Sequence, residues 1–198
     1  AREITEHVKN SFRKGNDQPR YEHLSIFALA PIPALVHFGN QIGNIVPVDL
    51  YQKHRDTDDW KWKNEPEKDP FEYKYTKNDA EANKNVVLVL SLSGKITALE
   101  YSRILSGTPV YEIEVEGANP NFLLYRSRLQ KFKAVYRQVL SEIRAKHGDD
   151  CTIHLFPAIP APIAVLCGKE LLPKSDPSLL LYDNDKTKGG FVPILKIN

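Results

Sequence analysis

The segment from residue 91 to residue 97, Ser-Leu-Ser-Gly-Lys-Ile-Thr, contains residue types that bind phosphate. Ser91 and Ser93 offer hydroxyls, Gly94 lets the backbone approach a ligand, and Lys95 offers a positive charge. The segment is not a P-loop, because Val89 stands where that motif requires its first glycine. We expect a phosphate contact here. The alternative is a plain turn between a strand and a helix.

Two tryptophans, Trp60 and Trp62, lie in the long polar stretch between Lys53 and Pro70. An aromatic ring that stacks on a nucleic-acid base contributes roughly 1–3 kcal/mol per base. We therefore expect Trp60 to cover a base while Arg55 or Lys61 approaches a neighbouring phosphate, with Trp62 as the second candidate for stacking. The alternative is that one of these rings only fixes the loop to the domain surface.

A third group of polar side chains, Asp183 and Lys186, follows an apolar run near the end of the chain. We expect them at the same sheet edge as Tyr51 and Arg55, where a carboxylate accepts hydrogen bonds from a base amine or a ribose hydroxyl. The spacing from Asp183 onward does not match a calcium loop, which also needs a terminal glutamate. A solvated turn is the alternative.

Other patterns in the sequence do not indicate chemistry. The His-Arg-Asp triplet at 54–56 resembles a kinase motif, but no glycine-rich loop accompanies it. The six histidines and two cysteines lack the close spacing of metal ligands. His37 and His154 are interpreted as histidines of the core or the sheet edge. No catalytic triad can be picked out, so we expect neither a metal nor catalysis.

The chain contains an internal repeat of the pattern F-x3-P-x-P-x5-G. It occurs at residues 27–39 and again at residues 156–168, and in each copy one strand precedes it and another follows. Pro31 in the first copy matches Pro160 in the second, where Pro157 lies in the same loop. Prolines in the first turn suit a helix start, and its free amides favour an anion. The repeat predicts two half-sites facing each other across a pseudo-two-fold axis, although each loop alone is also explained as a simple turn.

The hydrophobic patterning predicts strands that alternate with helices. We expect strands at 23–30, 46–52, 71–76, 86–92, 109–116, 151–156, 178–185 and 191–197. We expect helices at 4–14, 32–43, 96–105, 119–146 and 161–168. The alternation indicates an α/β fold with mainly parallel sheets and crossover helices. In such sheets, ligands bind outside the carboxyl ends of the strands.

Composition narrows the class of protein. With 198 residues, of which 41% are hydrophobic, the chain can bury a substantial core. The net charge of +2 is small for binding long nucleic acid. Two cysteines and no long apolar run indicate a cytoplasmic protein without a membrane segment. Since the chain starts at Ala1 and has no methionine, we expect a piece of a longer protein.

Three segments of the chain together resemble the SAVED family of bacterial antiphage (CBASS) effectors. They are the first proline block with the strand after it, the segment VVLVLSLSGKI, and the closing block from IHLF to YDND. The resemblance covers roughly residues 20–195. It implies two fused CARF-like Rossmann-type lobes at 21–198, related by the pseudo-two-fold. Residues 1–20 would then be a helix and linker from a missing effector domain.

The resemblance also implies a function. SAVED domains are sensors without enzymatic activity that bind a cyclic oligonucleotide made by a partner nucleotidyltransferase, then self-associate and activate a fused effector. For this chain we expect a cyclic dinucleotide, with a cyclic trinucleotide as the alternative. We also expect an HNH-type nuclease, so that DNA is contacted only through the effector. Two enzymes stay open as alternatives: a ring nuclease using Ser93, Lys95 and His154, and a nucleotide or sugar-phosphate enzyme on the same fold.

Overall fold

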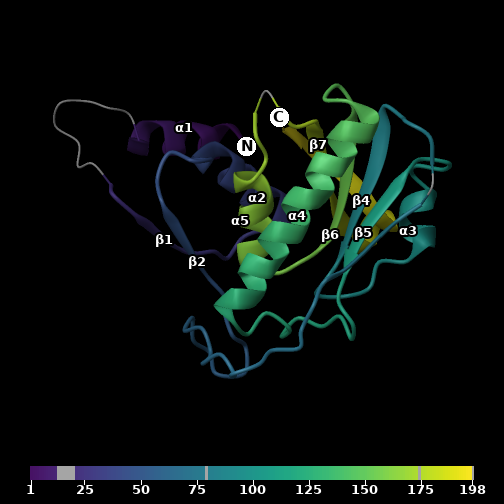
Figure 1. Ribbon diagram of the computed structural model, residues 1–198. Coiled ribbons are helices and arrows are strands. Elements are labelled where there is room, and N and C mark those ends of the chain that lie inside the picture. The colour runs from purple at the N-terminus through teal and green to yellow at the C-terminus, as the bar shows by residue number, and fades with distance from the viewer. Residues whose placement is uncertain (13–20, 79, 174, 198) are drawn as a thin grey trace.

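The computed structural model describes residues 1–12, 21–78, 80–173 and 175–197 (Figure 1). Its largest element is a six-stranded sheet. The order across this sheet is β3-β5-β4-β6-β7-β8. The strands are β3 (Lys74–Lys77), β4 (Asn85–Ser91), β5 (Val110–Glu114), β6 (Thr152–Ala158), β7 (Ser178–Asp185) and β8 (Gly190–Ile197).

The four central strands are parallel, whereas β3 and β8 run antiparallel at the two edges. Within β4, all residues from Val86 to Leu90 are fully buried, because helices and loops cover both faces of the sheet. The mainly parallel α/β fold predicted from the alternation of elements is therefore confirmed.

Helices cover the sheet on both faces. The long helix α4 (Arg126–His147) and the helix α5 (Ala161–Lys169) pack on one face through the main core. The short helix α3 (Ala98–Ser102) covers part of the other face, where Tyr101 packs on a smaller core that includes Val87 and Phe156. The connection from β7 to β8 contains the 3-10 turn η1 (Lys186–Lys188).

The long helix starts later than the sequence predicted. Asn119 and Pro120 do not open it, and helix α4 begins only at Arg126. The Asn119 side chain accepts a hydrogen bond from the Asn121 backbone N–H (2.9 Å), and this bond stabilises a turn in the loop before the helix. Phe122 and Leu123 are then buried in the core, which fixes this loop against the sheet.

A second, smaller α/β unit lies beside the large sheet (Figure 1). Strand β1 (Leu24–Phe27) pairs in parallel with β2 (Val48–Tyr51), and helix α2 (Ile32–Ile42) connects them. Helix α2 packs on α5, its counterpart in the repeat. The two units are thus very unequal, because one has two strands and the other has six.

The N-terminal helix α1 (Arg2–Phe12) packs on α2, where the Thr5 hydroxyl lies 3.0 Å from Nε2 of His37. The predicted linker after it, at 13–20, lies outside the described residues, and the domain boundary at residue 20 stays a prediction. Among the helices described, none is both long and apolar enough to cross a membrane.

Candidate functional site

The order of the strands reverses next to β4. This strand leads through α3 to β5 on one side, and β5 then leads through α4 to β6 on the other side of β4. At such a switch point, the loops that follow the two neighbouring strands, here β4 and β6, lead in opposite directions and leave a crevice for ligands. Here the loops remain close, since the Ala158 carbonyl accepts hydrogen bonds from the N–H groups of Leu92 (3.0 Å) and Ser93 (2.7 Å).

The loop after β4 contains the residues predicted to bind phosphate. Ser91 is fully buried, and its hydroxyl donates to Glu112 (2.8 Å) and accepts from the Ile96 N–H (3.2 Å). A side chain at Gly94 would meet open space, so packing does not require glycine at this position. Ser91 therefore shapes the loop from inside, while Ser93 and Gly94 lie partly exposed at its surface.

Lys95 is not a free ammonium group. It donates to Glu112 at 2.7 Å and to Glu114 at 2.5 Å, and these hydrogen bonds raise the pKa of Lys95 above its ordinary value. The two glutamates were missed by the sequence analysis. The alternating acidic residues of the strand VYEIE were the signal that could have identified them. A ligand phosphate would have to share Lys95 with both carboxylates.

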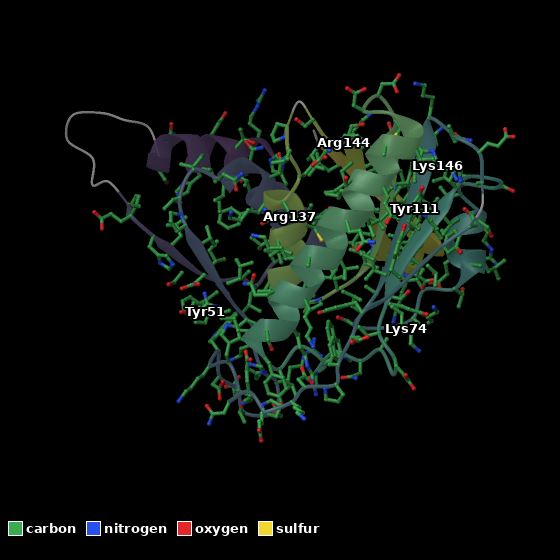
Figure 2. The ribbon with its side chains drawn as sticks, in the orientation of Figure 1. Tyr51, Lys74, Tyr111, Arg137, Arg144 and Lys146 are labelled. Carbon is green, nitrogen blue, oxygen red and sulfur yellow. The ribbon has the colours of Figure 1, made fainter. Side chains whose placement is uncertain are left out.

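A hollow with a volume of about 370 Å³ opens where β4 and β5 end. Its walls carry charges of both signs, which suits a ligand with several polar groups. It is lined by Lys74, Lys95, Glu114, Val115, Glu116, Gly117 and Ala118. Figure 2 labels Lys74, on the strand next to β5.

An aromatic cluster marks the carboxyl ends of β1 and β2. The rings of Phe27 and Tyr51 stack with their centroids 4.5 Å apart, and Trp60 meets Phe27 edge-on at 5.5 Å. Lys53 lies over the Trp60 ring at 5.7 Å. Phe27 remains 52% exposed, so this cluster has one uncovered side.

The second repeat contains an equivalent aromatic cluster, but it is buried. Phe156 stacks on Tyr182 at 4.3 Å, and Phe191 meets Phe156 edge-on at 5.2 Å. Phe156 is fully buried because β8 and α3 cover it. The same arrangement of three rings is therefore internal in the large unit and open to solvent in the small one.

The two tryptophans have different environments. Trp62 packs against the main core and donates its indole N–H to the Leu50 carbonyl (3.2 Å), whereas Trp60 lies at the aromatic cluster. Arg55 is exposed in a tight hairpin that the bridge between His54 and Asp59 closes. Trp62 thus anchors the loop, and Trp60 and Arg55 remain at its surface.

The remaining predicted residues lie at the starts of the repeat helices and in the last hairpin. Pro31 precedes α2 and is exposed, whereas Pro160 precedes α5 and is buried. Pro157 lies within β6. Asp183 accepts from the Asn184 N–H (3.0 Å), and Lys186 is exposed in the turn between β7 and β8. The structure gives these residues no common contact with Tyr51 or Arg55.

Two of the buried histidines, His154 and His54, pack against neighbouring side chains. His154 is buried between the Tyr182 hydroxyl (3.0 Å) and Asn85 (3.0 Å), and burial lowers the pKa of His154. His54 packs edge-on against Trp62, and burial also lowers its pKa. Within the described ranges, no group of three or more histidine, cysteine, aspartate or glutamate residues could hold a metal ion.

Other proteins share this mainly parallel α/β fold. The chain is similar to the Acinetobacter baumannii Cap4 SAVED/CARF-domain containing receptor with the cyclic trinucleotide 2′3′3′-cAAA, with 17% identity, a TM-score of 0.66, and coverage of 98% of this chain and 42% of that one. The same receptor with 3′3′3′-cAAA matches at 16% identity and a TM-score of 0.63, covering 89% and 39% of the two chains.

A receptor from Moraxella osloensis, also a Cap4 SAVED/CARF-domain protein, matches at 14% identity with a TM-score of 0.58, covering 89% of this chain and 37% of that one. The chain thus spans about two fifths of the length of these receptors. No curated protein matches it. The family described as "SMODS-associated and fused to various effectors sensor domain" (SAVED) matches residues 3–197, and the chain belongs to this family.

Proposed function

We propose that this domain is a sensor that binds a cyclic oligonucleotide at the carboxyl ends of its parallel strands. Membership in a sensor-domain family supports this function, as does the fold shared with a receptor that holds cyclic trinucleotides. The one similar receptor with a bound ligand holds a cyclic trinucleotide in both of its structures, so we propose a cyclic trinucleotide ahead of the dinucleotide expected from the sequence. CBASS antiphage defence is the biological context that we propose.

The exposed aromatic cluster is the structural observation that carries this proposal. Phe27 is half exposed although it is a large apolar ring, and Tyr51 and Trp60 lie against it. A base that stacks on this open side would cover apolar surface that is now in contact with water. Arg55, exposed on the same loop, and Lys53 would supply positive charge for the adjoining phosphates.

Calorimetric titration with 3′3′3′-cAAA and with a cyclic dinucleotide tests the proposal. We expect saturable binding of at least one of them and no comparable binding of a linear trinucleotide of the same bases. Chromatography of the ligand after incubation should return it intact. If neither cyclic compound binds, the sensor function is rejected. If the ring is opened, the domain is a ring nuclease.

The geometry does not favour the ring nuclease. His154 pairs in register with Val87, four residues before Ser91 along β4, which corresponds to roughly 13 Å. Both ring nitrogens of His154 have side-chain partners, and Lys95 pairs with two carboxylates. Ser93, Lys95 and His154 therefore do not converge on one reacting atom.

We also propose that ligand binding promotes self-association and, through it, activation of a fused nuclease, with the ligand supplied by a nucleotidyltransferase. In the small unit, β1 and β2 pair only with each other in the part of the chain described, and the aromatic cluster is uncovered. Such open surfaces are suited to contacts between molecules. Sedimentation with and without 3′3′3′-cAAA should show a larger species only with ligand; an unchanged monomer would contradict this.

A further inference from the structure

Strand β4, helix α3 and strand β5 form a strand–helix–strand unit with two parallel neighbours. Ser91, the last residue of β4, pairs in register with Glu114, the last residue of β5. Both strands therefore end at the same edge, where the hollow of about 370 Å³ opens. The side chain of Glu114 forms part of the wall of this hollow.

The position of Glu114 matches a general feature of nucleotide-binding units of this topology. In such units an acidic residue about twenty positions after the glycine loop, at the end of the second strand, accepts hydrogen bonds from ribose hydroxyls. Gly94 follows the first strand here, and Glu114 ends the second at about that distance along the chain. The loop after β4 contains Gly94 but not the other two glycines of the dinucleotide-binding fingerprint, so the match consists of the strand–helix–strand topology and the position of the acidic residue.

The local contacts leave Glu114 able to accept a hydrogen bond. Its Oε2 atom accepts from Lys95, whereas its Oε1 atom has no hydrogen bond within the described part of the chain. The Glu114 side chain is 27% exposed and Glu112 is 18% exposed, so Glu114 is the more accessible of the two carboxylates around Lys95. Glu112 instead accepts from both Ser91 and Lys95, which fixes the loop beside the hollow.

We propose that Glu114 accepts a hydrogen bond from a ribose 2′-hydroxyl of the bound nucleotide and so selects ribonucleotide rings over deoxyribonucleotide rings. This inference rests on the proposed function. Glu112 is a positioning residue, because it acts through Lys95 and Ser91. The two proposals thus assign selection of the sugar to the end of β5, and stacking of a base to Phe27 and Tyr51 at the ends of β1 and β2.

The test compares 3′3′3′-cAAA, in which every ribose 2′-hydroxyl is free, with its all-deoxy counterpart. We expect the unmodified domain to bind the ribose form at least tenfold more tightly, because a site built for a hydroxyl rejects an analogue without it. In Glu114→Ala this ratio should fall to near one. Loss of the carboxylate also lessens repulsion of the phosphates, but that change acts on both compounds alike, so the ratio is the decisive quantity.

Glu81→Ala is the control, because Glu81 is likewise a glutamate but is exposed and does not line the hollow. It should keep the ratio of the unmodified domain, and equal melting temperatures of the two variants would exclude unfolding. If the unmodified domain binds both compounds equally, or if Glu114→Ala keeps the ratio, the role of Glu114 is rejected while the sensor function stands. If the domain binds neither compound, both proposals fail.

Discussion

Gly39 and Gly168 occupy equivalent positions on either side of the crossing between α2 and α5. A methyl group on Gly39 would lie 1.9 Å from the Val165 carbonyl oxygen, and one on Gly168 would lie 1.8 Å from the Val36 carbonyl oxygen. Val36 and Val165 are themselves matched residues of the repeat. The two copies thus contact each other reciprocally through their backbones, as expected for duplicated segments related by an approximate two-fold axis.

Replacing either glycine by alanine should therefore destabilise the domain. The added methyl group would overlap a backbone carbonyl, which cannot move away as a flexible side chain would, and overpacking costs about 1–3 kcal/mol or more. Urea unfolding of Gly39→Ala and Gly168→Ala should show this loss. Gly94→Ala is the control, because a side chain there meets open space. Stable Gly39→Ala protein would contradict the close crossing.

The two tryptophans should respond differently to substitution. Trp60→Ala is expected to weaken binding of 3′3′3′-cAAA by about 1–3 kcal/mol while changing stability little, because it removes one wall of the exposed cluster. Trp62→Ala should instead lower the free energy of unfolding, by up to about 3 kcal/mol, because Trp62 packs on the core and donates a hydrogen bond to the Leu50 carbonyl. Calorimetry and thermal unfolding of both variants separate the two effects; the reverse pattern would make Trp60 the anchor.

Lys95→Ala should reduce affinity for a cyclic oligonucleotide at least tenfold, in line with about 1.5–3 kcal/mol for a hydrogen bond to a charged group. The substitution also leaves Glu112 and Glu114 without the cation between them, so repulsion of phosphate adds to the loss. Calorimetry over a range of salt concentrations measures both contributions. An unchanged affinity would show that Lys95 does not contact the ligand.

Glu142 should make the stability of the domain depend on pH in the acid range. Hydrogen bonds from Lys77, Gln138 and Tyr75 lower the pKa of Glu142 from 4.5 to about 2. Because folding lowers this pKa, the stabilisation is complete above pH 4.5 and is lost as the pH falls towards 2. The free energy of unfolding of Glu142→Gln should therefore lie below that of the unmodified domain at pH 7 and approach it near pH 2. A constant difference would contradict the lowered pKa.

The sequence by itself predicted the elements whose patterns are local. The continuous apolar run of β4 and the proline-started helices of the repeat depend on neighbouring residues, so spacing alone indicates them. The predicted start of α4 at Asn119 was wrong, because Asn119 forms a local side-chain hydrogen bond and Phe122 is buried in the core. Neither contact has a signature in the helical periodicity.

Only the tertiary structure decided the surroundings of the candidate site. The sequence alone predicted that Lys95 is free to bind phosphate. In the structure, the parallel pairing of β4 with β5 places Glu112 and Glu114 of β5 beside Lys95, and both form ion pairs with it. Phe27 and Phe156 are equivalent in the repeat, yet one is exposed and the other is buried, because β8 and α3 cover only the second copy. Pairings between strands join residues far apart along the chain, and the charge and exposure of a site depend on those pairings.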